Sequence, residues 1–230
     1  MGHSSLEETA KEFDQWAQNG RAESMANGHG NVTLQLLEKL PYAISGKTLD
    51  IGCGNGWLVR ECVSQGAQKS FGIDISPKMI AEAKRLEHFE GREIYAVGDA
   101  QKIDIPDNTF DLITSIESLY YYPNPVQALN EWYRITKAGG QLAIMIDLYK
   151  ESPATHSWIA ALDISVHLFS MKQLKEELEN IGWKNIQMHQ LQDTRPMKPK
   201  ETFQVSTFWP SYEQYVSYRE AGSLCIIAEK

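Results

Sequence analysis

The sequence predicts one α/β domain built on a mainly parallel, doubly wound sheet. Short apolar stretches that suit buried strands alternate with stretches whose apolar residues recur at helical spacing. Parallel neighbours need a crossover connection, which is usually a helix, so this alternation favours helices on both faces of the sheet. The chain of 230 residues is long enough for one such domain with a sizeable core.

Two helices are expected ahead of the first strand, and together they would form a helical cap, residues 1–44. The segment 5–8 has the S-x-x-E form of a capping box, and apolar residues follow it at helical spacing as far as Gly20. The glycine-rich stretch 27–30 indicates a joint. A second helix is expected over 32–40, where a proline ends it because proline cannot continue the helical hydrogen bonds.

The rest of the chain, 45–230, is expected to form the sheet and its helices. The expected strands are short apolar stretches, and they cover 47–51, 71–75, 93–97, 111–116, 141–146, 185–191 and 223–228. The expected helices open at capping residues or after glycine turns, near 57, 76, 124 and 170. Two stretches, 148–169 and 192–222, fit neither pattern. The second is too long for a plain hairpin loop, so we expect an insert at about 192–222. Both stretches follow strands of the sheet, so both are candidates for covering a ligand pocket.

Composition disfavours several classes of partner. The formal net charge is −8, which would repel a nucleic-acid backbone, so nucleic acid is not an expected partner. No apolar run approaches the roughly 20 residues needed to cross a bilayer, and no signal region opens the chain, so we expect no membrane association and a cytoplasmic protein. The cysteines and histidines are scattered without metal-ligand spacing, so the sequence predicts no metal site.

The segment 50–56 carries the most specific motif, with glycines at alternate positions between a strand and a helix. Such glycines let the backbone turn tightly and approach a ligand closely. A dinucleotide fingerprint reads G-x-G-x-x-G, whereas here the third glycine comes one residue early. Asp50 would oppose a pyrophosphate and suit a positively charged group. The motif therefore favours S-adenosylmethionine, whose amino-acid end carries an ammonium, over NAD.

Two further acids follow the next strands of the predicted sheet. In a nucleotide-binding fold, Asp74 would accept hydrogen bonds from the ribose hydroxyls. Asp99 could accept from the amino group of adenine, while the backbone N–H of Ala100 or Gln101 meets a ring nitrogen. Because the carboxyl ends of parallel strands meet at one edge of the sheet, we expect all three acids to line one crevice.

Together these motifs resemble the class I S-adenosylmethionine-dependent methyltransferases of the small-molecule, type 11-like kind. The matching segments are 50–56, 72–79, 98–100, 110–113 and 137–140. The resemblance is strong over about 47–147. It implies a Rossmann-like sheet of seven strands with an antiparallel last strand, covered by an N-terminal helical lid.

The motifs and the resemblance also imply which residues bind the cofactor. The expected cofactor-binding residues are Asp50, Gly52, Cys53, Gly54, Gly56, Asp74, Ile75, Met79, Asp99, Ala100, Gln101 and Ser115. Among them, Cys53 is expected to act as a small residue that fits the loop and not as a nucleophile.

Methyl transfer requires placement of the acceptor, and it requires a catalytic base only when the nucleophile loses a proton. The reaction type therefore does not by itself identify a catalytic base. The candidates for that role are His29, Glu117 and Tyr120. The candidates for contact with the acceptor are Trp16, Tyr120, His156 and Trp209. Each of these side chains also has a purely structural interpretation.

The expected reaction is methyl transfer to a small-molecule acceptor. Two alternatives stay open, a nicotinamide-dependent oxidoreductase and a non-catalytic S-adenosylmethionine-binding module. The sequence names neither the acceptor nor the element that is methylated, and it leaves the oligomeric state open.

Overall fold

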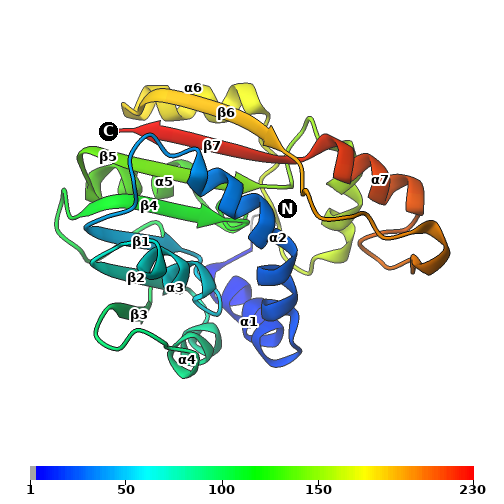
Figure 1. Ribbon diagram of the computed structural model, residues 1–230, viewed down its shortest axis with the longest axis horizontal. Helices are drawn as coiled ribbons and strands as arrows, with labels where there is room; N and C mark the ends of the chain where they lie inside the picture. Colours follow the sequence, from blue (N-terminus) through cyan, green and yellow to red (C-terminus); the bar gives the residue numbers. More distant parts are fainter. Residues whose placement is uncertain (1–3) are drawn as a thin grey trace.

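The computed structural model describes residues 4–230, so residues 1–3 of the expected cap lie outside the described part. Within it, seven strands form one sheet in the order β3-β2-β1-β4-β5-β7-β6 (Figure 1). The strands are β1 Lys47–Ile51, β2 Lys69–Asp74, β3 Glu93–Val97, β4 Phe110–Ile116, β5 Thr136–Ile146, β6 Lys184–Leu191 and β7 Ser223–Glu229. Strands β1 to β5 pair in parallel, whereas β7 runs antiparallel to both β5 and β6. The predicted α/β sheet with an antiparallel last strand is confirmed.

The helices begin largely where the capping residues place them. They are α1 Leu6–Gln18, α2 Arg21–Glu38, α3 Trp57–Ser64, α4 Pro77–Arg85, α5 Pro125–Ile135, α6 Met171–Ile181 and α7 Tyr212–Ala221, with short 3-10 helices η1 Leu119–Tyr121, η2 Pro153–Ala161 and η3 Lys200–Thr202. Ser5 forms the expected capping box with Glu8, and Ser76 caps α4 ahead of a proline at its first turn. None of the helices within residues 4–230 combines the length and the apolar character needed to span a membrane.

Helices cover both faces of the sheet because alternate strand residues point to opposite sides. On β5, Ile144 joins the core beneath α5 and α6, whereas Met145 joins the core beneath α2 and α3. Trp132 of α5 is fully buried, and its indole Nε1 donates to the carbonyl of Ala100 at 3.1 Å. The core therefore also fixes the loop that follows β3.

Helix α2 corrects the predicted joint at 27–30, because it runs through both glycines without interruption. Val32, Leu36 and Leu37 are buried against the sheet, and this packing outweighs the poor helix propensity of glycine. As a result, His29 lies in the middle of a helix and not on a loop ahead of one.

Replacing Gly30 with alanine is expected to raise the free energy of unfolding by about 0.5–1 kcal/mol, because alanine is the better helix former. A Cβ at Gly30 would meet nothing within 4 Å, and Gly30 lines neither of the two cavities described below. Gly56→Ala provides the contrast, since its φ is +76° and its Cβ would lie 2.6 Å from the ring of Tyr95. Urea unfolding measures both variants, and a destabilised Gly30→Ala protein would instead support a broken helix.

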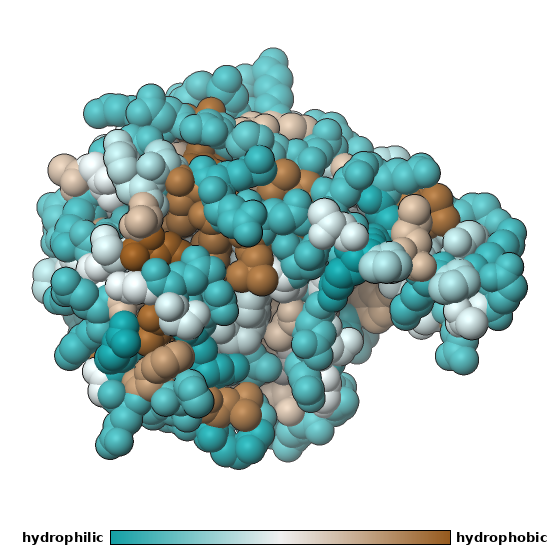
Figure 2. All heavy atoms as spheres, in the orientation of Figure 1, coloured by the Kyte–Doolittle hydropathy of each residue, from teal (hydrophilic) through white to brown (hydrophobic). Residues whose placement is uncertain are grey.

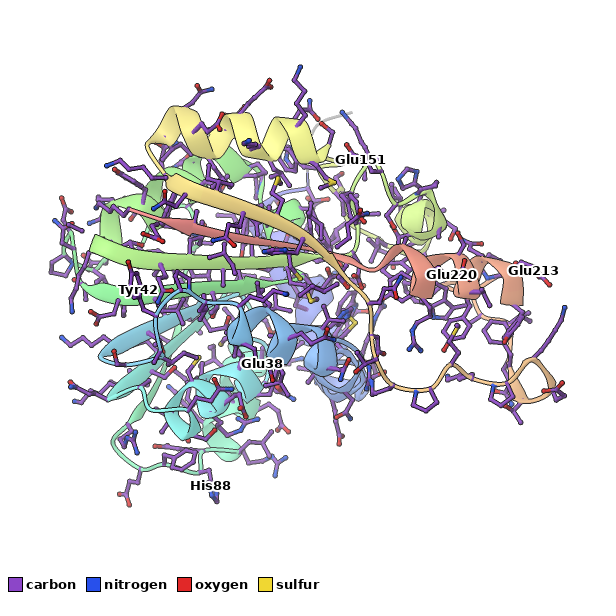
Figure 3. All side chains as sticks on the ribbon, turned by 45° about the horizontal axis from the view of Figure 1, so that its top comes forward. Glu38, Tyr42, His88, Glu151, Glu213 and Glu220 are labelled. Atoms are coloured by element: carbon purple, nitrogen blue, oxygen red, sulfur yellow. The ribbon has the colours of Figure 1, made fainter. Side chains whose placement is uncertain are left out.

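The insert is more regular than its sequence suggests. Both α7 and η3 fall within 192–222, and η2 falls within the other irregular stretch, 148–169. Figure 3 shows α7, labelled at Glu213 and Glu220, extending beyond the sheet with the preceding loop. Trp158 of η2 holds this projection, because its indole Nε1 donates to the carbonyl of Phe208 at 2.8 Å. In Figure 2 the projection extends from a surface that is mostly hydrophilic on this face.

Candidate active site

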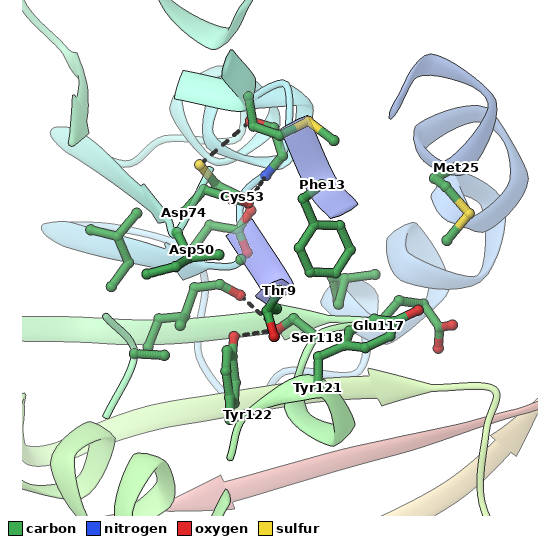
Figure 4. A pocket seen from close by; sticks show the side chains of 18 of the residues that line it. Thr9, Phe13, Met25, Asp50, Cys53, Asp74, Glu117, Ser118, Tyr121 and Tyr122 are labelled. Carbon is green, nitrogen blue, oxygen red and sulfur yellow. Dashed lines mark hydrogen bonds between the residues drawn. The ribbon is translucent and has the colours of Figure 1, made fainter. Parts of the chain in front are cut away.

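A cavity of about 120 Å³ lies where the carboxyl ends of the central strands meet (Figure 4). Thr9, Phe13 and Trp16 of α1 form one wall, and the loops that follow β1, β2, β3 and β4 form the others. Helix α1 is attached to the start of α4, because the Ser76 hydroxyl donates to the Asp14 carboxylate at 2.5 Å. The first helix therefore covers the strand ends as a lid.

The glycine loop after β1 takes a conformation that side chains would obstruct. Gly52, Gly54 and Gly56 all have positive φ angles, of 75°, 52° and 76°. A Cβ on Gly52 would lie 2.5 Å from the Cβ of Ser118, so the loop packs directly on the segment after β4. Gly52, Cys53 and Gly54 line the cavity, whereas Gly56 does not line it and instead caps α3.

Asp50 and Asp74 lie in this cavity as expected. The Asp74 carboxylate accepts hydrogen bonds from the backbone N–H of Gly54 and of Ser76, both at 2.9 Å, and so ties the glycine loop to the end of β2. Asp50 accepts a hydrogen bond from the Thr114 hydroxyl at 2.8 Å. Burial raises the pKa of Asp50 to about 7 and that of Asp74 to about 6.

The third acid also lies in this cavity. Asp99 and Ala100 line it, together with Met79 and Ile75. One oxygen of Asp99 accepts from both the backbone N–H and the side-chain amide of Gln101, at 2.9 and 3.0 Å. Gln101 itself does not line the cavity.

The serine on β4 also differs from expectation, because Ser115 does not line the cavity. It is fully buried, and its hydroxyl is hydrogen-bonded to that of Ser118 at 2.7 Å. Ser118 takes its place in the wall, because the chain turns at Glu117 and brings the following serine to the surface of the cavity.

A second cavity of about 1040 Å³ adjoins the first and lies between α1, α2 and the insert. Both cavities share five wall residues: Trp16, Met25, His29, Glu117 and Tyr121. Tyr120 and Trp209 also line the larger cavity, as expected of acceptor-contacting residues. His156 does not line either cavity, because its Nε2 is hydrogen-bonded to the carbonyl of Tyr149 at 3.1 Å.

Three ionisable side chains meet beside the boundary of the two cavities. His29 Nδ1 lies 3.3 Å from an Asp147 carboxylate oxygen, and the backbone N–H of Asp147 donates to Glu117. The Tyr120 hydroxyl donates to Glu117 and the Tyr218 hydroxyl to Asp147, each at 2.7 Å. Asp147 is fully buried, and its Oδ1 has no hydrogen-bond partner within residues 4–230. Three separate segments, α2, the end of β4 and the end of β5, thus build one polar cluster.

The pKa values of His29 and Glu117 in this cluster are both raised from their usual values. Burial, assisted by the charge of Asp147, raises the pKa of Glu117 to about 7. Burial alone would lower the pKa of His29, but the hydrogen bond to Asp147 and the charge of Glu117 outweigh it and raise that pKa to about 9. At neutral pH, therefore, His29 carries a proton and Glu117 is the group that titrates.

The backbone at Glu117 is also unusual, because its φ is +55°, a conformation that side-chain-bearing residues rarely adopt. Such strain costs of the order of 1–3 kcal/mol and is found more often at functional sites than elsewhere. Asn108 and Asn185 also have positive φ angles, but neither lines either of the cavities that Glu117 lines.

The same cluster offers one potential metal-ligand atom from each of His29, Glu117 and Asp147, all within 4.8 Å of one another. These residues are far apart in the sequence, so their spacing gives no metal signal. The prediction of no metal site therefore stays a prediction.

Sequence reasoning missed Asp147 and Tyr218. Asp147 directly follows β5, so the rule that led to the other strand-end acids would have found it. Tyr218 lies on α7, and nothing in the sequence separates it from the other aromatic residues of the insert.

Residues 49–144 match a family model whose description is "Methyltransferase domain". Methyltransferase GfsG from Streptomyces halstedii is 32% identical over 139 residues, which are 57% of this chain and 49% of that protein. The 27-O-demethylrifamycin SV methyltransferase from Amycolatopsis mediterranei is 30% identical over 126 residues, which are 54% of this chain and 46% of that protein. The chain thus spans about half the length of these curated relatives.

Among solved structures, a chain of the complex between the Haloferax volcanii Trm112 methyltransferase activator and a putative methyltransferase matches with a TM-score of 0.86 and 26% identity. The match covers 95% of this chain and 97% of that chain. An S-adenosylmethionine-dependent methyltransferase from Mesorhizobium loti matches with a TM-score of 0.68 and 20% identity, over 86% of this chain and 96% of that chain. The [4+2]-cyclase SpnF matches with a TM-score of 0.75 and 19% identity, over 100% of this chain and 97% of that chain. At these identities the last two share the fold alone.

Proposed function

Because the chain contains a methyltransferase domain of the class I, S-adenosylmethionine-dependent family, we propose that it transfers a methyl group from S-adenosylmethionine to a small-molecule acceptor. The observation that carries the proposal is the placement of Asp50, Asp74 and Asp99 in one cavity that adjoins a larger aromatic one. The smaller cavity would hold the cofactor and the larger one the acceptor. Their shared wall residues would then surround the reacting atoms.

In the smaller cavity, Asp50 would face the ammonium of the cofactor, because a buried carboxylate favours a positive partner. Asp74 would accept from the ribose hydroxyls, and Asp99 with Ala100 would meet the adenine edge. Ligand pockets usually measure about 300–1,000 Å³, so a nucleoside needs more room than the present volume offers. We therefore expect α1 to move outward when the cofactor binds.

The cofactor, when bound, supplies a methyl group that is already activated by a sulfonium charge. The protein would position the acceptor in line with this group and exclude water from the junction of the cavities. Where the nucleophile carries a proton, Glu117 would receive it, since its pKa of about 7 lies near neutral pH. His29 and Asp147 would act as positioning residues that hold the Glu117 carboxylate.

The two alternatives make different predictions. A nicotinamide oxidoreductase would need a pyrophosphate beside Asp50, which the buried carboxylate disfavours. A non-catalytic binding module would need no acceptor cavity. The fold by itself does not set the reaction, because one structure of this fold is named as a [4+2]-cyclase. Turnover has to be measured.

Calorimetric titration with S-adenosylmethionine, S-adenosylhomocysteine and NADH tests the cofactor. We expect both adenosyl compounds to bind in the micromolar range and NADH not to bind. Incubation with methyl-labelled S-adenosylmethionine and a metabolite extract, followed by mass spectrometry, then tests the reaction. A labelled small molecule supports transfer, whereas binding without any labelled product supports the non-catalytic module, and NADH binding alone supports the oxidoreductase.

A further inference from the structure

The larger cavity has a strongly positive wall, although the whole chain carries a net charge of −8. Its cationic lining residues are Arg21, Arg195, Lys198 and Arg219, and its acidic ones are Asp193 and Glu117. A local cluster of this kind, set against the overall charge, indicates attraction of a negatively charged group.

Two of these cations already have partners in the protein. Arg195 forms an ion pair with Asp193 at 2.8 Å and donates to the carbonyl of Gly28 at 2.6 Å. Arg219 donates to the hydroxyl of Tyr215 and lies 3.7 Å from Asp193. Arg195 therefore fixes the insert against α2, whereas Arg219 links segments within the insert. Asp193 is occupied by both arginines.

Arg21 differs from them, because its guanidinium has no hydrogen bond and no ion pair within residues 4–230. Its Cζ lies over the Trp16 ring, 3.6 Å from the centroid, and over the Phe208 ring, 4.5 Å from that centroid. Glu12 attracts it electrostatically, but a Glu12 oxygen accepts from the Trp16 indole at 2.7 Å. The aromatic pair thus holds a planar cation in the cavity wall with its donors unused.

We propose that Arg21 binds an oxyanion of the acceptor, so that the acceptor is an extended molecule with a carboxylate, sulfate or phosphate group. A planar guanidinium binds such groups through two parallel hydrogen bonds. This inference rests on the proposed function, because it takes the larger cavity as the acceptor cavity.

The position of Arg21 also indicates the length of the acceptor. Arg21 and His29 both lie on α2, eight residues apart, which corresponds to about 12 Å along the helix axis. His29 marks the junction where the methyl group would be transferred, since it lines both cavities. The oxyanion and the methylated atom are therefore expected near opposite ends of the acceptor, with an apolar or aromatic body between them.

The cofactor also carries a carboxylate, at its methionine end, and the same chemistry would suit it. Arg21 lines only the larger cavity, whereas Asp50 and the glycine loop line only the smaller one. This separation favours the acceptor as the source of the oxyanion, and the experiment below distinguishes the two sources.

Two fluorescent probes that differ by a single sulfonate group test the proposal. 1-Anilinonaphthalene-8-sulfonate carries the anion, and N-phenyl-1-naphthylamine has the same rings without it. Each is titrated into the full chain with and without saturating S-adenosylhomocysteine. We expect the sulfonate probe to bind about tenfold more tightly, because hydrogen bonds to charged groups are the stronger ones. Arg21→Gln should remove this preference without changing the affinity for the neutral probe, and Arg21→Lys should retain part of it.

The matched control is Lys198→Gln, which removes the same charge from the same cavity wall outside the aromatic pair. An equal loss in this control would assign the preference to the overall field of the cavity and overturn the proposal, as would an Arg21→Gln protein that keeps the preference. Loss of S-adenosylhomocysteine affinity in Arg21→Gln, with the sulfonate preference intact, would assign Arg21 to the cofactor. A parent protein that fails to bind S-adenosylhomocysteine would contradict the proposed function, while the probe comparison without it would still decide the role of Arg21.

Discussion

Replacing Asp74 with alanine is expected to weaken S-adenosylmethionine binding roughly 100-fold or more, because two kinds of hydrogen bond are lost together. The carboxylate would accept from the ribose hydroxyls of the cofactor. It also accepts from the backbone N–H of Gly54 and Ser76, so it fixes the loop on which the cofactor would lie. Hydrogen bonds to a charged acceptor contribute about 1.5–3 kcal/mol each, and two of them account for the expected factor.

Calorimetry with S-adenosylhomocysteine measures this effect, and a second variant separates its two causes. Asp74→Asn keeps one carbonyl oxygen that can accept from a backbone N–H, so it should weaken binding less than alanine does. Asp104→Ala, an exposed aspartate outside both cavities, is the matched control and should bind like the parent. An Asp74→Ala protein that folds normally and binds as tightly as the parent would reject the ribose assignment.

The sheet and the acid cluster could be predicted because their signals are local in the sequence. Each strand is a short apolar stretch, and the acids directly follow their strands, so chain order alone places them at one edge of the sheet. The structure accordingly brings Asp50, Asp74 and Asp99 into one cavity. The strand bounds differ most at β5, which begins at Thr136 rather than near 141 because the segment after α5 already pairs with Phe110.

The path of α2 could not be predicted from local propensity. Glycines at 28 and 30 indicate a break, yet tertiary packing of Leu36 and Leu37 on the sheet favours a continuous helix. Because of the predicted break, His29 was expected on a loop, whereas it lies within α2. The sequence therefore did not indicate that His29 faces Asp147.

The polar cluster and the acceptor cavity depend on contacts between distant segments. Asp147 and Tyr218 are hydrogen-bonded to each other although they are 71 residues apart, and Trp158 meets Phe208 across 50 residues. Single-sequence patterns carry no information on such pairs. Conversely, His156 is an attractive candidate by residue type, but a local hydrogen bond to Tyr149 holds it outside both cavities.

Glu117→Gln is expected to lower turnover by a factor of about 10²–10⁴, the usual contribution of a general base, where the acceptor loses a proton. The amide keeps the size of the side chain and one of its two acceptor oxygens, and it touches the cofactor cavity only at the shared wall, so cofactor affinity should change less than about twofold. Turnover is measured with saturating cofactor on the acceptor that the extract assay identifies. Saturation matters because Asp50 also has a raised pKa, of about 7, and would otherwise add its own pH dependence.

The pH profile gives the sharper test. A base must be ionised to accept a proton, so the turnover of the parent should rise with pH and level off above the pKa of Glu117, at about 7. The Gln variant should lack this rising limb. Tyr120→Phe removes the hydroxyl that donates to the Glu117 carboxylate, a hydrogen bond that lowers its pKa. We therefore expect this variant to keep most of its turnover and to shift the rising limb to higher pH.

Turnover measured with and without EDTA distinguishes Glu117 as a general base from Glu117 as a metal ligand. Glu117 could share a metal ion with His29 and Asp147, and loss of the carboxylate would then also lower turnover. EDTA should leave the parent unchanged if Glu117 acts as a base. Loss of turnover with EDTA, restored by added divalent metal, would assign the cluster to metal binding. A Gln variant with the turnover and the pH profile of the parent would show that the nucleophile needs no base at this position.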